Sequence, residues 1–170
     1  IYNCSFTGVV TGEDYVGGLV GRNELTGTIV KVKVSGAVRG DNMTGGIVGI
    51  NNGTVIDAVN EALINTESVE NKLDIGNLEL TLDLTKLSTQ KAAASQDMGG
   101  IAGYSSGIIA NSENRGDVGF HHQGYNIGGI AGRSLGHIVV SKNVGLITGR
   151  KDIGGIVGQM EPYIIKSLSP

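Results

Sequence analysis

The chain has 170 residues, 29 of them glycine and only two proline, and its 13 basic and 16 acidic side chains give a net charge of −3. It lacks a block of Lys and Arg, which argues against binding to nucleic acid or to an anionic membrane surface. No stretch approaches the roughly 18 apolar residues of a membrane-spanning helix, so we expect no membrane insertion by this segment.

A pentapeptide, Gly-Gly-(Leu/Ile)-(Val/Ala)-Gly, occurs five times, and successive copies start 28, 54, 29 and 26 residues apart. A fixed period of this size indicates a solenoid, because a single unit cannot bury its own apolar face. The glycines let the chain turn a corner and let equivalent corners stack directly on one another. Those expected to have this structural role are Gly17, Gly18, Gly21, Gly45, Gly46, Gly49, Gly99, Gly100, Gly103, Gly128, Gly129, Gly132, Gly154, Gly155 and Gly158.

The remaining segments, taken in chain order, share one register. Residues 26–38 align with residues 106–118 and 135–147, and residues 1–10 fall into the same register as residues 29–38. Each repeat therefore offers three β-rich pieces of about four to six residues, separated by turn-forming Gly, Asn, Ser or Asp. This pattern predicts an all-β fold: a parallel β-helix, or β-solenoid, with about 26–29 residues and three short strands per rung, and a right-handed path.

The alignment also makes expectations about single residues. Ile47 and Val48 should stack on their counterparts in neighbouring rungs, with one member of each pair pointing inward and the other outward. The only cysteine, Cys4, aligns with Val32, Ser112 and Ser141. We therefore expect Cys4 to be a small buried residue rather than a reactive thiol.

An insertion at about residues 61–95 accounts for the 54-residue step and differs from the rest of the chain. Its central part alternates strictly between apolar and polar residues from Leu78 to Thr85, the pattern of a strand with one buried face. Two roles remain open for it. It either shields an apolar flank of the solenoid, or forms a binding surface, with Glu79 and Asp83 as candidate ligand-binding residues beside Tyr104 and Tyr125.

The boundaries of the chain lie inside repeats. Residue 1 falls partway through one unit, and residues 161–170 start another. We therefore expect a single β-solenoid domain over residues 1–170 that belongs to a longer protein.

The sequence offers no catalytic constellation, and we expect no enzymatic activity, cofactor or metal. His121 and His122 are adjacent and are interpreted as loop residues, and His137 follows a turn glycine. The acidic residues before the pentapeptides, among them Asp97 and Asp152, are interpreted as solvated turn residues rather than a cation-binding ladder. A polysaccharide-active β-helix enzyme would need carboxylates gathered on one face, whereas these acids are scattered.

The five pentapeptides and the Asn/Ser-x-Gly-x-Ile segments after them resemble the GLUG repeat. The resemblance covers nearly the whole chain outside the insertion. That family occurs in large bacterial surface proteins, including the N-terminal regions of some secreted immunoglobulin-A proteases and many adhesin-like proteins. The resemblance implies an extracellular β-solenoid on a bacterial cell surface, of the Gram-positive type, without a catalytic role.

Two functions are compatible with this resemblance. The favoured one is a rigid stalk or display module in adhesion. The alternative is a module that binds a host or matrix protein or a glycan directly, through the insertion and the two tyrosines. A solenoid that ends in open strand edges also predicts end-to-end self-association.

Overall fold

The computed structural model describes residues 1–66 and 95–161, which form parallel β-strands wound into a β-solenoid of about five turns. The parallel β-helix expected from the repeat is therefore confirmed. Within these ranges no helix is long and apolar enough to cross a membrane. The strands are β1 (Ser5–Thr11), β2 (Val20–Asn23), β3 (Thr28–Arg39), β4 (Asn42–Gly45), β5 (Val48–Asn51), β6 (Thr54–Ile64), β7 (Gln96–Gly99), β8 (Ala102–Ser105), β9 (Ile108–Ala110), β10 (Glu113–Asn114), β11 (Tyr125–Gly128), β12 (Ala131–Ser134), β13 (His137–Val139), β14 (Lys142–Asn143), β15 (Lys151–Gly154) and β16 (Val157–Met160).

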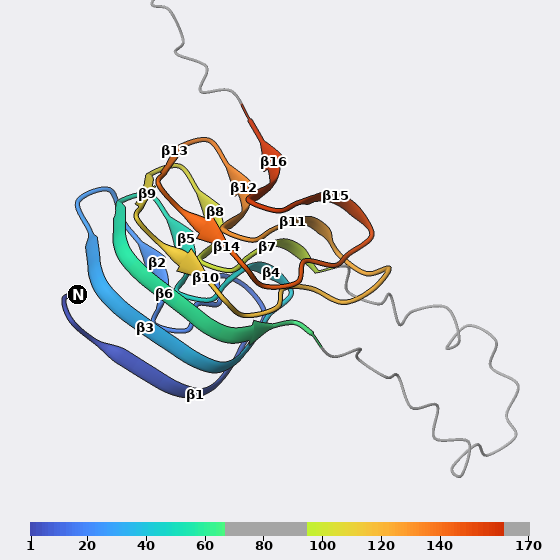
Figure 1. Cartoon of the computed structure of the whole chain (residues 1–170), viewed down its shortest axis with the longest axis horizontal. Helices are drawn as coiled ribbons and strands as arrows, with labels where there is room; N and C mark the ends of the chain where they lie inside the picture. The colour runs from blue at the N-terminus through green and yellow to red at the C-terminus, as the bar shows by residue number, and fades with distance from the viewer. Residues whose placement is uncertain (67–94, 162–170) are drawn as a thin grey trace, which may run out of the picture.

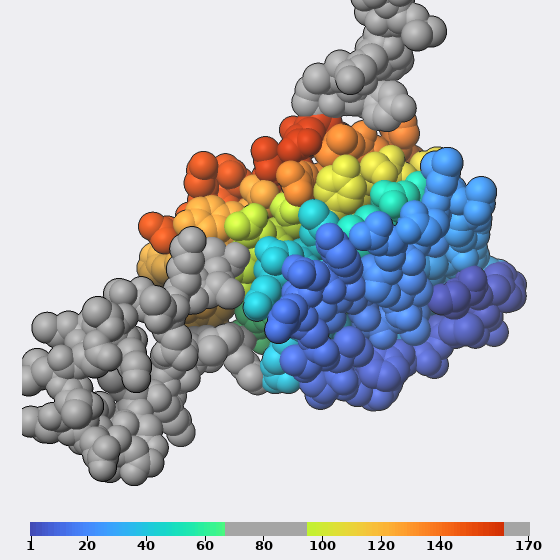
Figure 2. All heavy atoms as spheres, turned by 180° about the vertical axis from the view of Figure 1, so that it is seen from behind, coloured from blue at the N-terminus to red at the C-terminus, as the bar shows by residue number. Residues whose placement is uncertain are grey.

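Three parallel sheets form the faces of the solenoid (Figure 1). Sheet A contains β1, β3, β6, β9, β10, β13 and β14; sheet B contains β4, β7, β11 and β15; and sheet C contains β2, β5, β8, β12 and β16. The chain passes through sheets B, C and A in turn and then climbs one rung. Figure 2 shows the result as bands that follow the chain order from one end of the molecule to the other.

The pentapeptides lie where sheet B turns into sheet C, in the expected register. Val48 pairs with Val20 on one side and with Ala102 on the other. Residues equivalent to Ile47 form a second column, in which the amide of Leu19 donates to the carbonyl of Ile47 and the amide of Ile47 to that of Ile101. Stacking identical corners thus carries one hydrogen-bond ladder and one apolar column from rung to rung.

The expected alternation within each apolar pair is wrong, because Ile47 and Val48 are both fully buried and both belong to the hydrophobic core. The turn folds sheet C back against sheet B. A Cβ on Gly49 would lie 2.4 Å from the carbonyl carbon of Tyr15, and one on Gly103 would lie 2.3 Å from that of Met43. Because the two sheets lie this close together, each residue of the apolar pair is covered, whichever way its side chain points.

Sheet A also departs from the expected strand lengths of four to six residues. Strand β3 has 12 residues and β6 has 11, whereas the later rungs divide the same path into β9 and β10 or β13 and β14. One residue of each rung adopts a positive φ at this place: Asn3, Lys31, Asp57, Asn111 and Val140. The bend is therefore a constant feature of the rung, and only the continuity of hydrogen bonding on each side of it varies.

Cys4 lies in the expected column, since β1 pairs with β3 and places Ser5 beside Lys33. However, Cys4 is exposed, so the expected burial is wrong. Its counterparts Val32, Ala58 and Ser112 are buried between two rungs. Cys4 belongs to the first described rung, which is covered on one side only, and a column position is buried only where a rung lies on both sides.

The described residues that flank the insertion lie at the corner between sheets A and B. Asn65 adopts a positive φ, and its side-chain amide donates to the carbonyl of Gly40 at 2.7 Å and accepts from the amide of Gly40 at 3.0 Å. On the other side of the insertion, the carbonyl of Ser95 accepts from the amide of Tyr125 at 3.0 Å. The strand predicted around residues 78–85 lies outside the described residues.

Candidate functional site

The two candidate tyrosines lie on different sheets, Tyr104 on β8 of sheet C and Tyr125 on β11 of sheet B. Both rings are already engaged by cations: the guanidinium carbon of Arg133 lies 5.3 Å from the centre of the Tyr104 ring, and that of Arg150 lies 5.9 Å from the Tyr125 ring. A sugar or a base that stacked on the same face of either ring would have to displace this cation.

Other described tyrosines have the same kind of neighbour. Arg22 lies over Tyr15 at 4.8 Å, and the ammonium of Lys31 lies 5.7 Å from the centre of the Tyr2 ring. These pairs are spread over the three sheets, because Tyr2 bridges to Val30 of sheet A and Tyr15 precedes the bridge of Gly17 to sheet B. The described tyrosines do not gather into one stacking platform.

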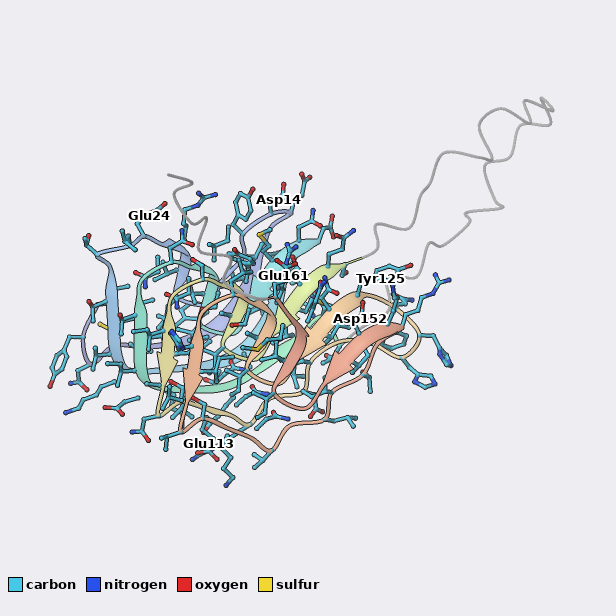
Figure 3. All side chains as sticks on the ribbon, turned by 90° about the horizontal axis from the view of Figure 1, so that it is seen from above. Asp14, Glu24, Glu113, Tyr125, Asp152 and Glu161 are labelled. Atoms are coloured by element: carbon cyan, nitrogen blue, oxygen red, sulfur yellow. The ribbon has the colours of Figure 1, made fainter. Side chains whose placement is uncertain are left out.

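The acidic candidates Glu79 and Asp83 lie outside the described residues. The described residues that flank the insertion lie at the corner where Ser95 accepts a hydrogen bond from the amide of Tyr125. In Figure 3, Tyr125 and Asp152 lie near this corner, whereas Glu113 lies on the far side, over sheet A.

A partly buried ion pair that the sequence analysis missed links sheets B and C. A guanidinium nitrogen of Arg133 lies 2.6 Å from the carboxylate of Asp97, which is only 3% exposed. The other carboxylate oxygen of Asp97 accepts from the side-chain amide of Asn126 at 2.7 Å. Asp97 is therefore not the solvated turn residue that was expected. The missed signal for this pair is the position of Arg133, which lies in the same column as Tyr104. Arg133 is therefore one rung further along the chain than Asp97.

A column of asparagines runs through the interior, beside sheet A. The side-chain amide of Asn60 donates to Asn114, and that of Asn114 donates to Asn143, both at 2.7 Å. Each of these amides also donates to the main-chain carbonyl two residues further on, at 2.8–3.1 Å. Asn60 and Asn114 are fully buried. The Asn-x-Gly at Asn114 and Asn143 was the available signal for this ladder, whereas Asn60 is followed by Glu61 and Ala62.

The outer face of sheet A carries a chain of ion pairs across the rungs. Glu61 contacts Lys33 at 2.9 Å and Arg115 at 3.1 Å, and Glu113 contacts Arg115 at 2.9 Å and Lys142 at 3.7 Å. The hydrogen bond from Lys33 is the main cause that lowers the pKa of Glu61, and the one from Arg115 lowers the pKa of Glu113. The same contacts raise the pKa of Arg115.

The lowered pKa values predict that the protein loses stability in acid. A carboxyl whose pKa is lower in the folded state stabilises the fold above its unfolded pKa, about 4.3 for Glu, and loses that contribution as the pH falls through the folded value. We expect the urea midpoint, followed by far-UV circular dichroism, to fall below about pH 5. The double variant Glu61→Gln/Glu113→Gln should show a smaller fall. If the urea midpoint of the double variant falls with pH as steeply as that of the wild type, other groups cause the acid sensitivity.

The histidines lie in exposed positions, as expected. His121 and His122 occupy a turn, with ring centres 3.7 Å apart, and His137 is exposed on β13. Within residues 1–66 and 95–161, no three His, Cys, Asp or Glu side chains are grouped closely enough to hold a metal ion.

Comparison with known proteins gives one match. The family model described as the GLUG motif matches residues 12–39, which run from the approach to the first pentapeptide through β2 and β3. No curated protein and no solved structure matches the chain. The match supports a GLUG-repeat region and, together with the β-solenoid fold, is compatible with a structural repeat module.

Proposed function

We propose that this chain is a rigid, non-catalytic spacer in a bacterial cell-surface protein, where it projects another module in adhesion. The observation that carries the proposal is the continuity between rungs. Parallel hydrogen-bond ladders join each rung to the next on three faces, and the Asn60–Asn114–Asn143 ladder joins three successive rungs in the interior. A force along the axis would have to break many of these bonds together.

The surface chemistry favours this role over direct ligand binding. Charged side chains on sheet A neutralise one another across rungs, and the rings of Tyr104 and Tyr125 are covered by arginines. The extracellular location and the bacterial source rest on the resemblance to the GLUG repeat.

A mechanical measurement tests the spacer function. The full chain is tethered at both ends and stretched along its axis in a single-molecule force experiment. We expect resistance up to a distinct unfolding force, which should fall when Asn114 is replaced by alanine. Gradual extension without a force peak would contradict a load-bearing role.

A binding array separates the spacer from the ligand-binding alternative. The folded full chain is tested against glycans and extracellular-matrix proteins, and a spacer should give no saturable binding. The array is repeated with Tyr104→Ala, with Tyr125→Ala and with a variant in which a short Gly-Ser link replaces residues 67–94. A hit that one of these changes abolishes, while circular dichroism stays unchanged, would overturn the spacer function and locate the binding surface.

A further inference from the structure

The turn between β5 and β6 consists of Asn52 and Gly53, which form the only Asn-Gly dipeptide in the sequence. The next two rungs also have a glycine at this place, but there it follows Ser106 or Leu135. A backbone amide attacks the side chain of a preceding asparagine most readily when it belongs to glycine, because glycine has no Cβ to hinder the approach. This turn is therefore the one in its column that carries the reactive pair.

The amide nitrogen of Gly53 is not held in the hydrogen-bond ladder. In the next rung, the amide of Gly107 donates to the carbonyl of Asn51 at 3.2 Å, and Gly136 repeats this contact one rung further along. Among the described residues, the amide of Gly53 has no acceptor. Its nitrogen can therefore react without first breaking a hydrogen bond.

The side chain of Asn52 is positioned by the neighbouring rungs. Its oxygen accepts from the hydroxyl of Ser106 at 2.9 Å, and its nitrogen donates to a carboxylate oxygen of Glu24 at 3.3 Å. When a nucleophile attacks the amide carbon, negative charge develops on the oxygen, and a donor placed beside that oxygen stabilises the charge. The hydroxyl of Ser106 is such a donor. Asn52 is half-buried, so water reaches its side chain.

We infer that Asn52 is a site of spontaneous deamidation, in which the amide of Gly53 is the nucleophile and the hydroxyl of Ser106 assists. The amide of Gly53 gives its proton to the solvent, and its nitrogen bonds to Cγ of Asn52. The bond between Cγ and Nδ2 breaks, and Nδ2 takes up a proton from water and leaves as ammonia. One water molecule then opens the resulting cyclic imide at either of its two carbonyls, which gives aspartate or isoaspartate. The reaction requires only this turn and water, and so it does not depend on the spacer function.

Both products disturb the packed corner. Aspartate places a second carboxylate beside Glu24, and the like charges repel. Isoaspartate adds a methylene to the main chain between stacked turns, where space is short. A Cβ on Gly53 would lie 2.2 Å from the carbonyl oxygen of Gly27, and one on Gly107 would lie 2.0 Å from that of Gly53. We therefore expect the hydrogen bond from the amide of Thr54 to the carbonyl of Gly27 to lengthen.

Peptide mapping of the full chain tests this chemistry. The folded protein is incubated at neutral pH, sampled over several weeks and digested with trypsin, and the peptide of residues 40–72 is fragmented in a mass spectrometer. We expect the mass increase of deamidation at Asn52, with isoaspartate among the products.

Asn111 is the control site within the same chain. It is exposed, but the amide that follows it, that of Ser112, donates to the hydroxyl of Ser141 at 3.3 Å. Deamidation at Asn111 should be at least about fivefold slower than at Asn52, because its nucleophile must first lose a hydrogen bond.

A variant separates the contribution of the fold from that of the dipeptide. Ser106→Ala removes the donor to Asn52 and should slow deamidation of the folded chain by at least about threefold. The two residues are 54 positions apart, so in urea the variant and the wild type should react at the same rate. Ser141→Ala is the matched control: it removes a hydroxyl that does not contact Asn52, and it should leave the rate at Asn52 unchanged. Circular dichroism checks that each variant is folded.

Two results would overturn the inference. If Asn52 reacts in urea but stays intact in the folded chain, the fold protects this turn from deamidation. If Ser106→Ala leaves the rate of the folded chain unchanged, the hydroxyl does not assist the reaction.

Discussion

Replacing Gly100 with alanine is expected to destabilise the protein by about 3 kcal/mol, because overpacking a rigid backbone contact cannot be relieved by a side-chain movement. A Cβ at this position would lie 2.3 Å from the carbonyl oxygen of Gly129 in the next rung and 2.2 Å from the side-chain Cγ of Asn114. The neighbouring rung would have to move away, and the hydrogen-bond ladders on both sides of the corner would lengthen. Urea denaturation followed by circular dichroism measures the loss.

The same substitution at Gly155 provides the matched control. Gly155 is the equivalent second glycine of its pentapeptide, yet no heavy atom of the described residues lies within 4 Å of a Cβ built on it. Gly155→Ala should therefore change stability by no more than about 0.5 kcal/mol. Equal losses at the two positions would mean that the backbone conformation of the glycine, rather than the packing of rung on rung, makes alanine unfavourable.

Replacing Asn114 with alanine should cost about 3 kcal/mol, because the change leaves several buried polar groups without a partner. The side-chain amide of Asn60 loses its acceptor, Asn143 loses a donor, and the carbonyl of Gly116 loses the amide that bonds to it. Asn60 is fully buried, so water cannot replace the hydrogen bond that its side chain loses. The shift of the urea midpoint measures this effect.

Asn143 is the control for this prediction, since it ends the described ladder and is only partly buried. Asn143→Ala leaves one side-chain donor, that of Asn114, without its acceptor in the neighbouring rung, and should cost about 1 kcal/mol. If Asn143→Ala costs as much as Asn114→Ala, the stabilisation comes from the local turn that each asparagine caps and not from the ladder.

The two substitutions should also be coupled, because Asn114 provides one of the two close contacts at Gly100. Gly100→Ala should cost less in the Asn114→Ala background than in the wild type. The contact with the carbonyl of Gly129 remains, so the relief should be partial. Strict additivity would show that Asn114 yields freely to the new methyl group.

The sequence alone determined the architecture, and the reason is the repeat. Five copies of one pentapeptide, 26–29 residues apart except for one 54-residue step, define which residues stack, because equivalent residues of a solenoid can only lie above one another. The columns through Val48 and Ile47, and even the position of Cys4 beside Val32, follow from that alignment.

Burial and pairing, by contrast, depend on how neighbouring sheets and rungs approach, which the tertiary structure alone decides. Ile47 and Val48 are both buried because sheet C folds onto sheet B, and Cys4 is exposed because its rung has a neighbour on one side only. Asp97 meets Arg133 across a distance of 36 residues in the chain. Residue spacing along one strand cannot reveal such a contact, because the two side chains come from different sheets and successive rungs, and only the packed corner brings them together.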